Sequence, residues 1–289
     1  MWADFWAQKT ASPFEEAVSA FLFRWNTEIR SLAQALFYLG TAFCGVVSCY
    51  DSRIGRDELV QLFAVVLLYG GDEGKGFCAG LDVKQGLTDY EQTVPGFYHY
   101  QIKLGELEWF IAKTPQPWIT LIDNVSAGGG FSLAMCSDIR VCTKTARFSC
   151  FYANVGIGGC DMSSSYFLPR LIGTGRAYEM MLTGNFINAD EAWNLGLVSK
   201  VVDERKDLVP AGLELARVIA AKDPMAVRLT KEAMRANVDA SGFDNALQVE
   251  NRNQTLMIAH NVNKDASQDP IGKYWIEDRT DPMNPKGAN

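Results

Sequence analysis

The middle of the chain alternates between short, continuous apolar runs and stretches with helical spacing. Residues 62–71 form an apolar run that ends in glycines, which is typical of a strand buried on both faces. A second run over residues 118–122 follows a proline-containing loop, and shorter runs over 138–142 and 146–150 predict two more strands. Strands that alternate with helices in this way predict an α/β fold with right-handed crossovers.

Beyond the predicted strands, the apolar positions follow helical spacing. Asn188 and Glu191 form the pattern of a capping box, and Gly196 stands where a glycine would end that helix. Pro224 is suited to the first turn of a further helix, after which apolar positions recur three and four residues apart. The C-terminal third is therefore predicted to be a helical layer.

No internal repeat or low-complexity linker divides the chain. We predict the α/β core for residues 61–200, preceded by a divergent N-terminal segment over 1–60. That segment is either a true variant or the product of a faulty gene model. Residues 201–262 are expected to form a C-terminal helical region that serves oligomerisation, and residues 263–289 a loose polar tail.

The N-terminus carries acidic residues and no basic stretch, which argues against a signal peptide or a transit peptide. Residues 31–50 contain no charge and are just long enough to span a bilayer. Their polar positions, including Gln34 and Thr41, instead favour a buried helix, a turn and a strand. We therefore expect a soluble, intracellular protein of the cytosol, the mitochondrial matrix or a peroxisome, with a membrane-tethered protein as the alternative.

Composition narrows the possible functions. The 289 residues are 48% hydrophobic and 21% charged, as in ordinary soluble proteins. A net charge of -7 argues against nucleic acid as the main partner, because phosphate neutralisation needs a basic surface. The seven cysteines lack a C-x-x-C pair and lie mostly in apolar runs, so we expect reduced core residues. With only His99 and His260, neither a metal site nor a histidine-based triad is expected.

Two glycine-containing loops stand before helical stretches. Residues 128–130 are consecutive glycines directly before a short apolar segment, and a second loop over residues 74–86 follows the first predicted strand. Such runs are kept where the backbone bends sharply or approaches another group closely. A tight strand-to-helix turn explains each loop alone. Two of them can instead aim two backbone N–H groups at one carbonyl oxygen, as in an oxyanion hole.

Five segments follow one another in a characteristic order: GKGFCAGLDVK, NVSAGGGFSLAMCSDIRV, ARFSCFYANVGIG, YFLPRLIGTGRAYEMMLTG and INADEAWNLGLVSKVV. Together they closely resemble the enoyl-CoA hydratase/isomerase (crotonase) superfamily, from about Val65 to His260. The resemblance implies a repeated ββα core, assembly as a homotrimer or a dimer of trimers, and an acyl-CoA thioester as substrate. It also implies that no cofactor is needed, since CoA arrives as part of the substrate.

The resemblance assigns the two oxyanion donors to the backbone N–H groups of Leu81 and Gly129. Lys75 and Lys84 flank the loop over residues 74–86, where they either meet the phosphates of CoA or are simply solvated. The remaining loop residues that the resemblance places around the thioester are Ala79, Gly80, Gly128 and Gly130.

The chain departs from the hydratases of this family at two positions. Those hydratases carry one glutamate where this chain has Ser132, and a second where it has Tyr152. A serine cannot replace a carboxylate in proton transfer, and a tyrosine with an ordinary pKa of about 10 is a poor base. We still expect both side chains to line the substrate site, but not hydration by a pair of glutamates. The family's usual first strand is also not recognisable before Val65.

One acidic residue remains near these positions. Asp161 lies about where family members that shift double bonds place a catalytic aspartate, and it is also suited to cap a helix that begins near Ser163. A carboxylate beside an oxyanion hole can remove and return a proton next to a thioester, which predicts isomerisation or hydration of an enoyl-CoA. The alternative is a catalytically inactive homologue that binds acyl-CoA. Neighbouring Cys160 is expected to be a packed thiol, and Asp138 a structural residue.

Overall fold

The computed structural model describes residues 45–50, 63–70, 75–81 and 93–262. Contacts divide the chain into two compact units, Met1–Ala221 and Lys222–Asn289. Most of the predicted N-terminal segment and the predicted polar tail lie outside the described residues.

The uncharged segment of residues 31–50 lies outside the described residues as far as residue 44. Its last residues form strand β1 (Gly45–Tyr50), so the strand predicted for the end of this segment is confirmed. None of the helices in the described part of the chain has the length and apolar character needed to cross a bilayer.

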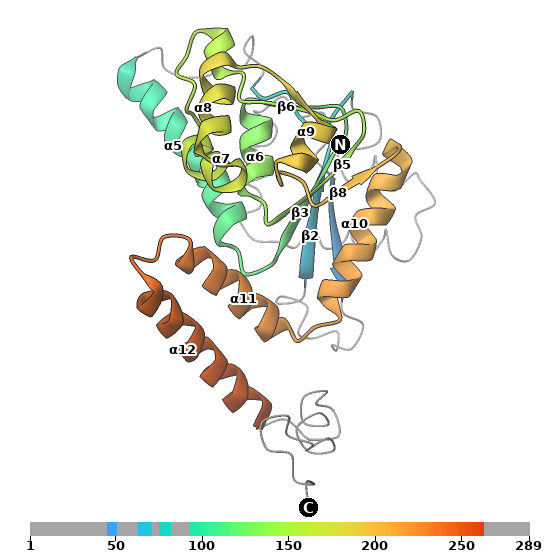
Figure 1. The fold of residues 1–289 in the computed structure, drawn as a ribbon, viewed down its shortest axis with the longest axis vertical. Helices are drawn as coiled ribbons and strands as arrows, with labels where there is room; N and C mark the ends of the chain where they lie inside the picture. Colours follow the sequence, from blue (N-terminus) through green and yellow to red (C-terminus); the bar gives the residue numbers. More distant parts are fainter. Residues whose placement is uncertain (1–44, 51–62, 71–74, 82–92, 263–289) are drawn as a thin grey trace, which may run out of the picture. The chain divides into compact units, whose positions relative to one another are not determined.

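A five-stranded sheet forms the centre of the first unit (Figure 1). Its neighbouring strands are, in order, β1, β2 (Phe63–Tyr69), β3 (Trp118–Ile122), β5 (Ile139–Thr143) and β8 (Lys200–Val202). β1 runs antiparallel to β2, and the other neighbours are parallel, as expected for an α/β fold. The strand predicted at the end of residues 31–50 is thus paired with β2, although the family's usual first strand was not recognisable before Val65. The pairing partner of a strand cannot be read from that strand's own pattern.

A second, smaller sheet carries the loops of interest. It consists of β4 (Val125–Ala127), β6 (Arg147–Ser149) and β7 (Ile187–Asn188). β4 and β6 are parallel, whereas β6 and β7 are antiparallel. The strands predicted over residues 62–71, 118–122, 138–142 and 146–150 are thus all confirmed to within a few residues.

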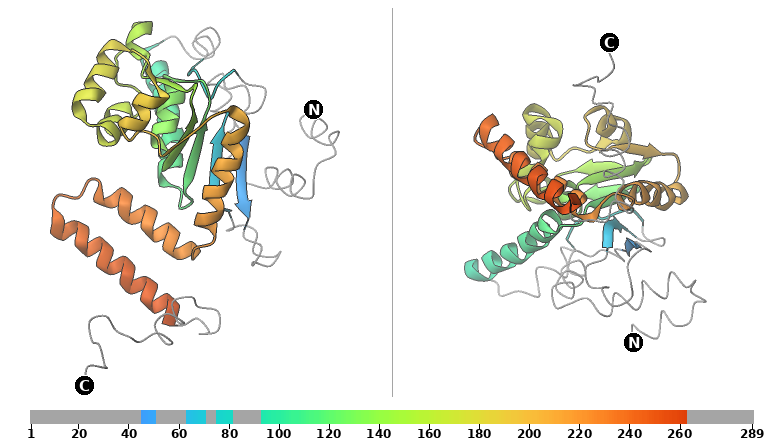
Figure 2. Two further views of the ribbon diagram at one scale, coloured as in Figure 1. Left: turned by 45° about the vertical axis from the view of Figure 1, so that its right-hand side comes forward. Right: turned by 90° about the horizontal axis from the view of Figure 1, so that it is seen from below.

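Successive residues of β2 pack on opposite faces of the large sheet, because side chains alternate along a strand. Val65 belongs to one apolar core and Val66 to the other. The first core is completed by α10 (Arg205–Ala220), whose buried face includes Leu208. Figure 2 shows α10 on one face of the sheet and the remaining helices of the unit toward the other.

The helices of that other face hold the larger core. They are α5 (Val94–Lys113), α6 (Gly129–Cys136), α7 (Ser164–Ile172), α8 (Thr174–Thr183), α9 (Ala189–Asn194) and the 3₁₀ helix η2 (Tyr152–Val155). The predicted capping box of α9 is confirmed, since the Glu191 N–H donates to Asn188 Oδ1 at 2.9 Å and the Asn188 N–H to Glu191 Oε2 at 3.0 Å. Gly196 follows the helix with a φ of +74°.

The second unit contains α11 (Pro224–Asn237) and α12 (Phe243–Val262). The Asn253 side chain joins them by donating to the Leu229 carbonyl at 3.2 Å. The C-terminal helical region was predicted to span residues 201–262. In the structure α10 packs on the sheet, and the second unit begins at Lys222.

Candidate active site

The two glycine-containing loops lie side by side and are joined by backbone hydrogen bonds. Cys78 forms an isolated parallel bridge with Ser126 in β4. The Cys78 N–H donates to the Val125 carbonyl at 3.0 Å, and the Cys78 carbonyl accepts the Ala127 N–H at 2.9 Å. Around Cys78, the loop over residues 74–86 therefore runs along β4 like an added strand, and its Gly80 lies beside the start of α6.

Glycine is required where these loops touch. A Cβ atom on Gly80 would lie 3.1 Å from the Ala127 carbonyl oxygen and 3.3 Å from the Gly129 nitrogen. Gly80 also has a φ of +100°, a conformation that other residues rarely adopt. A Cβ atom on Gly130 would overlap the backbone carbonyl of Cys78. The glycines thus allow close backbone–backbone contact between the N-terminus of α6 and the loop over residues 74–86.

Two backbone N–H groups at this contact have no acceptor among the described residues. Gly129 is the first residue of α6, and the first N–H groups of a helix lack intrahelical acceptors. The N–H of Gly128, by contrast, donates to the Ser149 carbonyl at 3.1 Å. The second free N–H belongs to Leu81, which directly follows Gly80. The touching loops therefore present two donors, one of them at the positive end of a helix dipole.

The side chains of Ser132 and Tyr152 are hydrogen-bonded to each other beside the glycine run of residues 128–130. Ser132 Oγ lies 2.8 Å from the Tyr152 hydroxyl, and the two side chains are 0% and 6% exposed. The Tyr152 ring also lies against the glycine run, since a Cβ atom on Gly128 would be 3.7 Å from its Cε1 atom. Burial raises the Tyr152 pKa far above its ordinary value, although the Ser132 hydrogen bond opposes this effect. Tyr152 is therefore a neutral phenol at any physiological pH.

Asp161 lies in a strained turn that leads into α7. Met162 and Ser163 have φ values of +46° and +58°, which are uncommon for residues other than glycine. The Asp161 carboxylate accepts the Met162 N–H at 2.8 Å and the Gln101 amide at 3.5 Å. The N-cap of α7 is Ser163, and no side-chain hydrogen bond caps the helix. The carboxylate is thus held by its own turn and by α5, and it does not cap α7.

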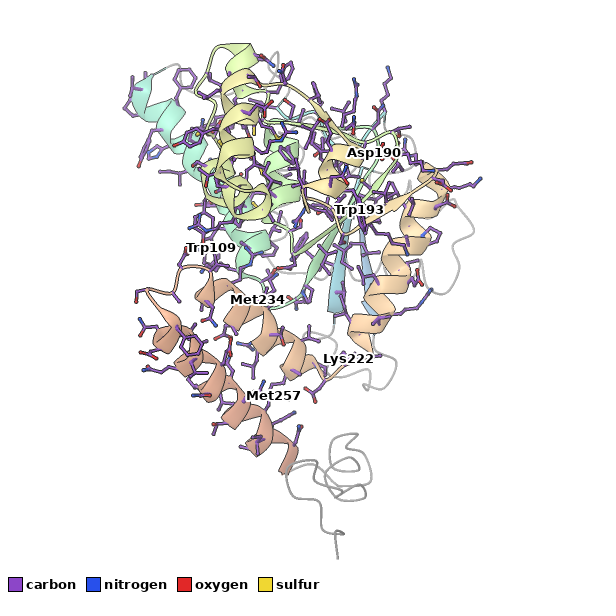
Figure 3. All side chains as sticks on the ribbon, viewed as in Figure 1. Trp109, Asp190, Trp193, Lys222, Met234 and Met257 are labelled. Atoms are coloured by element: carbon purple, nitrogen blue, oxygen red, sulfur yellow. The ribbon has the colours of Figure 1, made fainter. Side chains whose placement is uncertain are left out.

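The structure adds Glu108, a buried acidic residue that the sequence analysis missed. Glu108 lies on α5 and is 2% exposed, whereas the next residue, Trp109, is 64% exposed on the outer side of the helix (Figure 3). Ser163 Oγ donates to Glu108 Oε2 at 2.5 Å. The spacing contained a signal, because Glu108 continues the apolar stripe of Leu104 and Ile111 at helical intervals.

The environment of Glu108 favours its neutral form. Burial raises the pKa of this carboxyl from 4.5 to about 8, the Ser163 hydrogen bond lowers it, and the negative charge of Asp161 raises it further. Glu108 also acts electrostatically on Tyr152. Four polar side chains therefore gather next to the glycine loops: Glu108, Ser132, Tyr152 and Asp161.

The other predicted residues are more dispersed. Lys75 is exposed and Ala79 lies at the surface, while Lys84 is outside the described residues. Asp138 accepts the Trp118 N–H at 2.8 Å, which confirms a structural role. Cys160 is exposed, so the prediction of a packed thiol is wrong. Gly159 and Asp161, which flank it in the sequence, are turn-forming residues, and turns commonly face solvent.

Among the cysteines whose side chains the structure describes, Cys78, Cys136, Cys142 and Cys150 are buried free thiols, as expected. Within the described ranges no cluster of three or more His, Cys, Asp or Glu side chains is placed to hold a metal ion.

A family model for enoyl-CoA hydratase/isomerase matches residues 57–274. The chain belongs to the enoyl-CoA hydratase/isomerase family. It is 34% identical over 227 residues to the "Probable enoyl-CoA hydratase echA12" of Mycobacterium leprae, covering 75% of this chain and 74% of that protein. It is 29% identical over 211 residues to the 1,2-epoxyphenylacetyl-CoA isomerase of Escherichia coli, covering 71% and 75%. The crystal structure of enoyl-CoA hydratase from Bacillus anthracis superposes with a TM-score of 0.66 at 29% identity, covering 74% of this chain and 79% of that one.

As a member of the enoyl-CoA hydratase/isomerase family, the chain is an enzyme of that type with the crotonase-like α/β fold. The resemblance carried by the five segments is thereby confirmed. The glycine loops, Glu108 and Asp161 all lie inside the matched residues.

Proposed function

We propose that the chain acts on an enoyl-CoA and stabilises a thioester enolate with the backbone N–H groups of Leu81 and Gly129. The contact between Gly80 and Gly129 is the observation that supports this most strongly. It brings together two N–H groups that have no acceptor in the part of the chain that the structure describes, and preorganised donors of this kind stabilise an oxyanion as its charge develops. The dipole of α6 adds to this effect at Gly129.

In this proposal Asp161 transfers the proton. Ser132 and Tyr152 stand where related hydratases carry glutamates, but they are neutral and bonded to each other. Asp161 is partly exposed, so both a substrate and a proton from solvent can reach it. Its carboxylate removes a proton next to the thioester, the electrons move to the carbonyl oxygen, and the enolate is reprotonated at the α or the γ carbon.

The reaction is accordingly a double-bond isomerisation, or a hydration in which Asp161 activates a water molecule. The relatives' names include both a "Probable enoyl-CoA hydratase" and a "1,2-epoxyphenylacetyl-CoA isomerase". CoA is part of the substrate, no other cofactor is required, and the exposed Lys75 is available to the CoA phosphates. A homotrimer or a dimer of trimers is the assembly that we expect.

The test is the absorbance of the conjugated enoyl thioester with purified protein. The substrates are a 2-enoyl-CoA, a 3-enoyl-CoA and a 3,5-dienoyl-CoA, each with wild type, Asp161→Asn and the control Asp190→Asn. Asp190 is an exposed aspartate in the first turn of α9 (Figure 3). We expect turnover of at least one substrate by wild type and by the control, and a loss of at least about 100-fold in Asp161→Asn.

The neutral Ser132–Tyr152 pair also favours a second candidate, a homologue that binds acyl-CoA without turning it over. Binding of a non-reactive acyl-CoA together with no turnover of any substrate would establish this candidate and refute the proposed catalysis.

A further inference from the structure

Glu108 is buried on the apolar face of α5 with only one of its oxygens satisfied. Ser163 Oγ donates to Oε2, while Oε1 is buried and has no hydrogen-bond partner among the described residues. An ionised carboxylate is acceptor-only on both oxygens, and leaving one of them unpaired away from water is unfavourable. A carboxylic acid avoids most of this penalty, so the geometry favours the protonated form.

The charged and titratable groups around Glu108 reinforce this preference. Asp161, in the turn before α7, and Tyr152, in η2, both interact with it electrostatically. α6 also contacts α5, and it carries no charged residue. No basic side chain is among the groups that act on Glu108 within the described residues. We call Glu108 and Asp161 the carboxyl pair. The negative charge of Asp161 adds to burial in opposing the ionisation of Glu108, and no basic side chain of the described residues offsets it.

We propose that Glu108 is a positioning residue that keeps its proton in the resting enzyme, so that the single negative charge of the carboxyl pair stays on Asp161. Asp161 is partly exposed, and its carboxylate accepts the Met162 N–H and the Gln101 amide, so its two oxygens have the partners that Glu108 Oε1 lacks among the described residues. The strained turn at Met162 and Ser163 carries both Asp161 and the Ser163 hydroxyl that donates to Glu108. This inference rests on the proposed function, in which Asp161 is the proton-transferring group.

The arrangement has a consequence for the pH dependence of turnover. Ionisation of Glu108 puts a second negative charge beside Asp161 and near the enolate that forms at the glycine loops. The transition state is then destabilised, and kcat is lost as the pH rises through the Glu108 pKa of about 8. Tyr152 does not contribute to this loss, because its own pKa lies far higher.

The test is the pH profile of kcat for wild type, Glu108→Gln and Glu106→Gln. Glutamine reproduces the neutral acid and cannot ionise. Glu106 is an exposed residue of the same helix, so its substitution is a matched control. We expect kcat of wild type and of Glu106→Gln to fall by nearly tenfold per pH unit above about 8, as a single ionisation requires. Glu108→Gln should keep at least a third of the wild-type kcat below the transition and show no fall above it. An alkaline fall that persists in Glu108→Gln, or a Glu108→Gln enzyme that is folded but inactive at every pH, would overturn the inference.

A second measurement needs no turnover and keeps the two proposals distinguishable. The infrared band of the buried carboxylic acid, taken as the difference between wild type and Glu108→Gln, should disappear as the pH rises through about 8. In Asp161→Asn its midpoint should move to lower pH, because a neighbouring negative charge has been removed. If no substrate is turned over but this band behaves as expected, the proposed reaction is wrong, and the inference that Glu108 keeps its proton beside Asp161 is retained. If the band is absent at neutral pH, the pair is refuted whatever the activity.

Discussion

Replacing Glu108 by Gln should remove a pH dependence from the stability of the fold. Burial, with a contribution from the charge of Asp161, raises the Glu108 pKa from 4.5 to about 8 in the folded protein. Between these values the folded state holds a proton that the unfolded chain has released, so wild-type stability falls as the pH rises. Each pH unit is worth about 1.4 kcal/mol, and the whole window therefore costs wild type about 5 kcal/mol of unfolding free energy. Below the window this stability is fully present, and above it the loss is complete.

The assay is urea unfolding followed by tryptophan fluorescence, at a series of pH values on both sides of this window. Glu108→Gln should gain on wild type steadily across the window, by about 5 kcal/mol in all, while Glu106→Gln follows wild type. Parallel curves for wild type and Glu108→Gln would refute the reasoning, because they would mean that Glu108 ionises at the same pH in the folded and unfolded states.

Two further predictions concern the glycine loops and the Ser132–Tyr152 pair. Gly80→Ala should lower kcat/KM by about 10- to 100-fold, since the new Cβ atom displaces the Leu81 N–H. The control is Gly105→Ala in α5, where a new Cβ atom meets nothing within 4 Å. This variant should keep wild-type activity and raise the free energy of unfolding by about 0.5–1 kcal/mol. Equal activities of the two variants would contradict the role of the loop contact. Tyr152→Phe leaves Ser132 Oγ buried without its partner and should lower the free energy of unfolding in urea by about 1–3 kcal/mol. Its kcat should stay within about threefold of wild type. A much larger loss of kcat would show that the phenol transfers the proton.

Local patterns in the sequence predicted most of the elements. The run Trp118–Ile122 is a strand with the predicted bounds, because a continuous apolar run buried on both faces has a strong signal. The capping box of Asn188 and Glu191 was equally predictable from the sequence, since the two residues lie only three positions apart. The glycines at residues 128–130 were recognised as a site of close approach for the same local reason.

The features that the sequence missed depend on contacts between distant segments. β1 is paired with β2, and its own pattern does not reveal that partner. Glu108 and Ser163 are 55 residues apart in the chain, and only packing brings them together. The turn before α7 does contain turn-forming residues, but the strain at Met162 and Ser163 depends on tertiary contacts such as the hydrogen bond from Ser163 to Glu108.

The central claim is that this chain forms an enolate of an acyl-CoA between its glycine loops, with Asp161 as the base. The most direct measurement is the exchange of the α-protons of a saturated acyl-CoA for deuterium in D₂O, followed by mass spectrometry. Exchange requires only enolate formation and does not depend on whether the full reaction is an isomerisation or a hydration. The account predicts exchange with wild type, and a loss of at least about 100-fold with Asp161→Asn. Binding of the acyl-CoA by wild type without any exchange would contradict it.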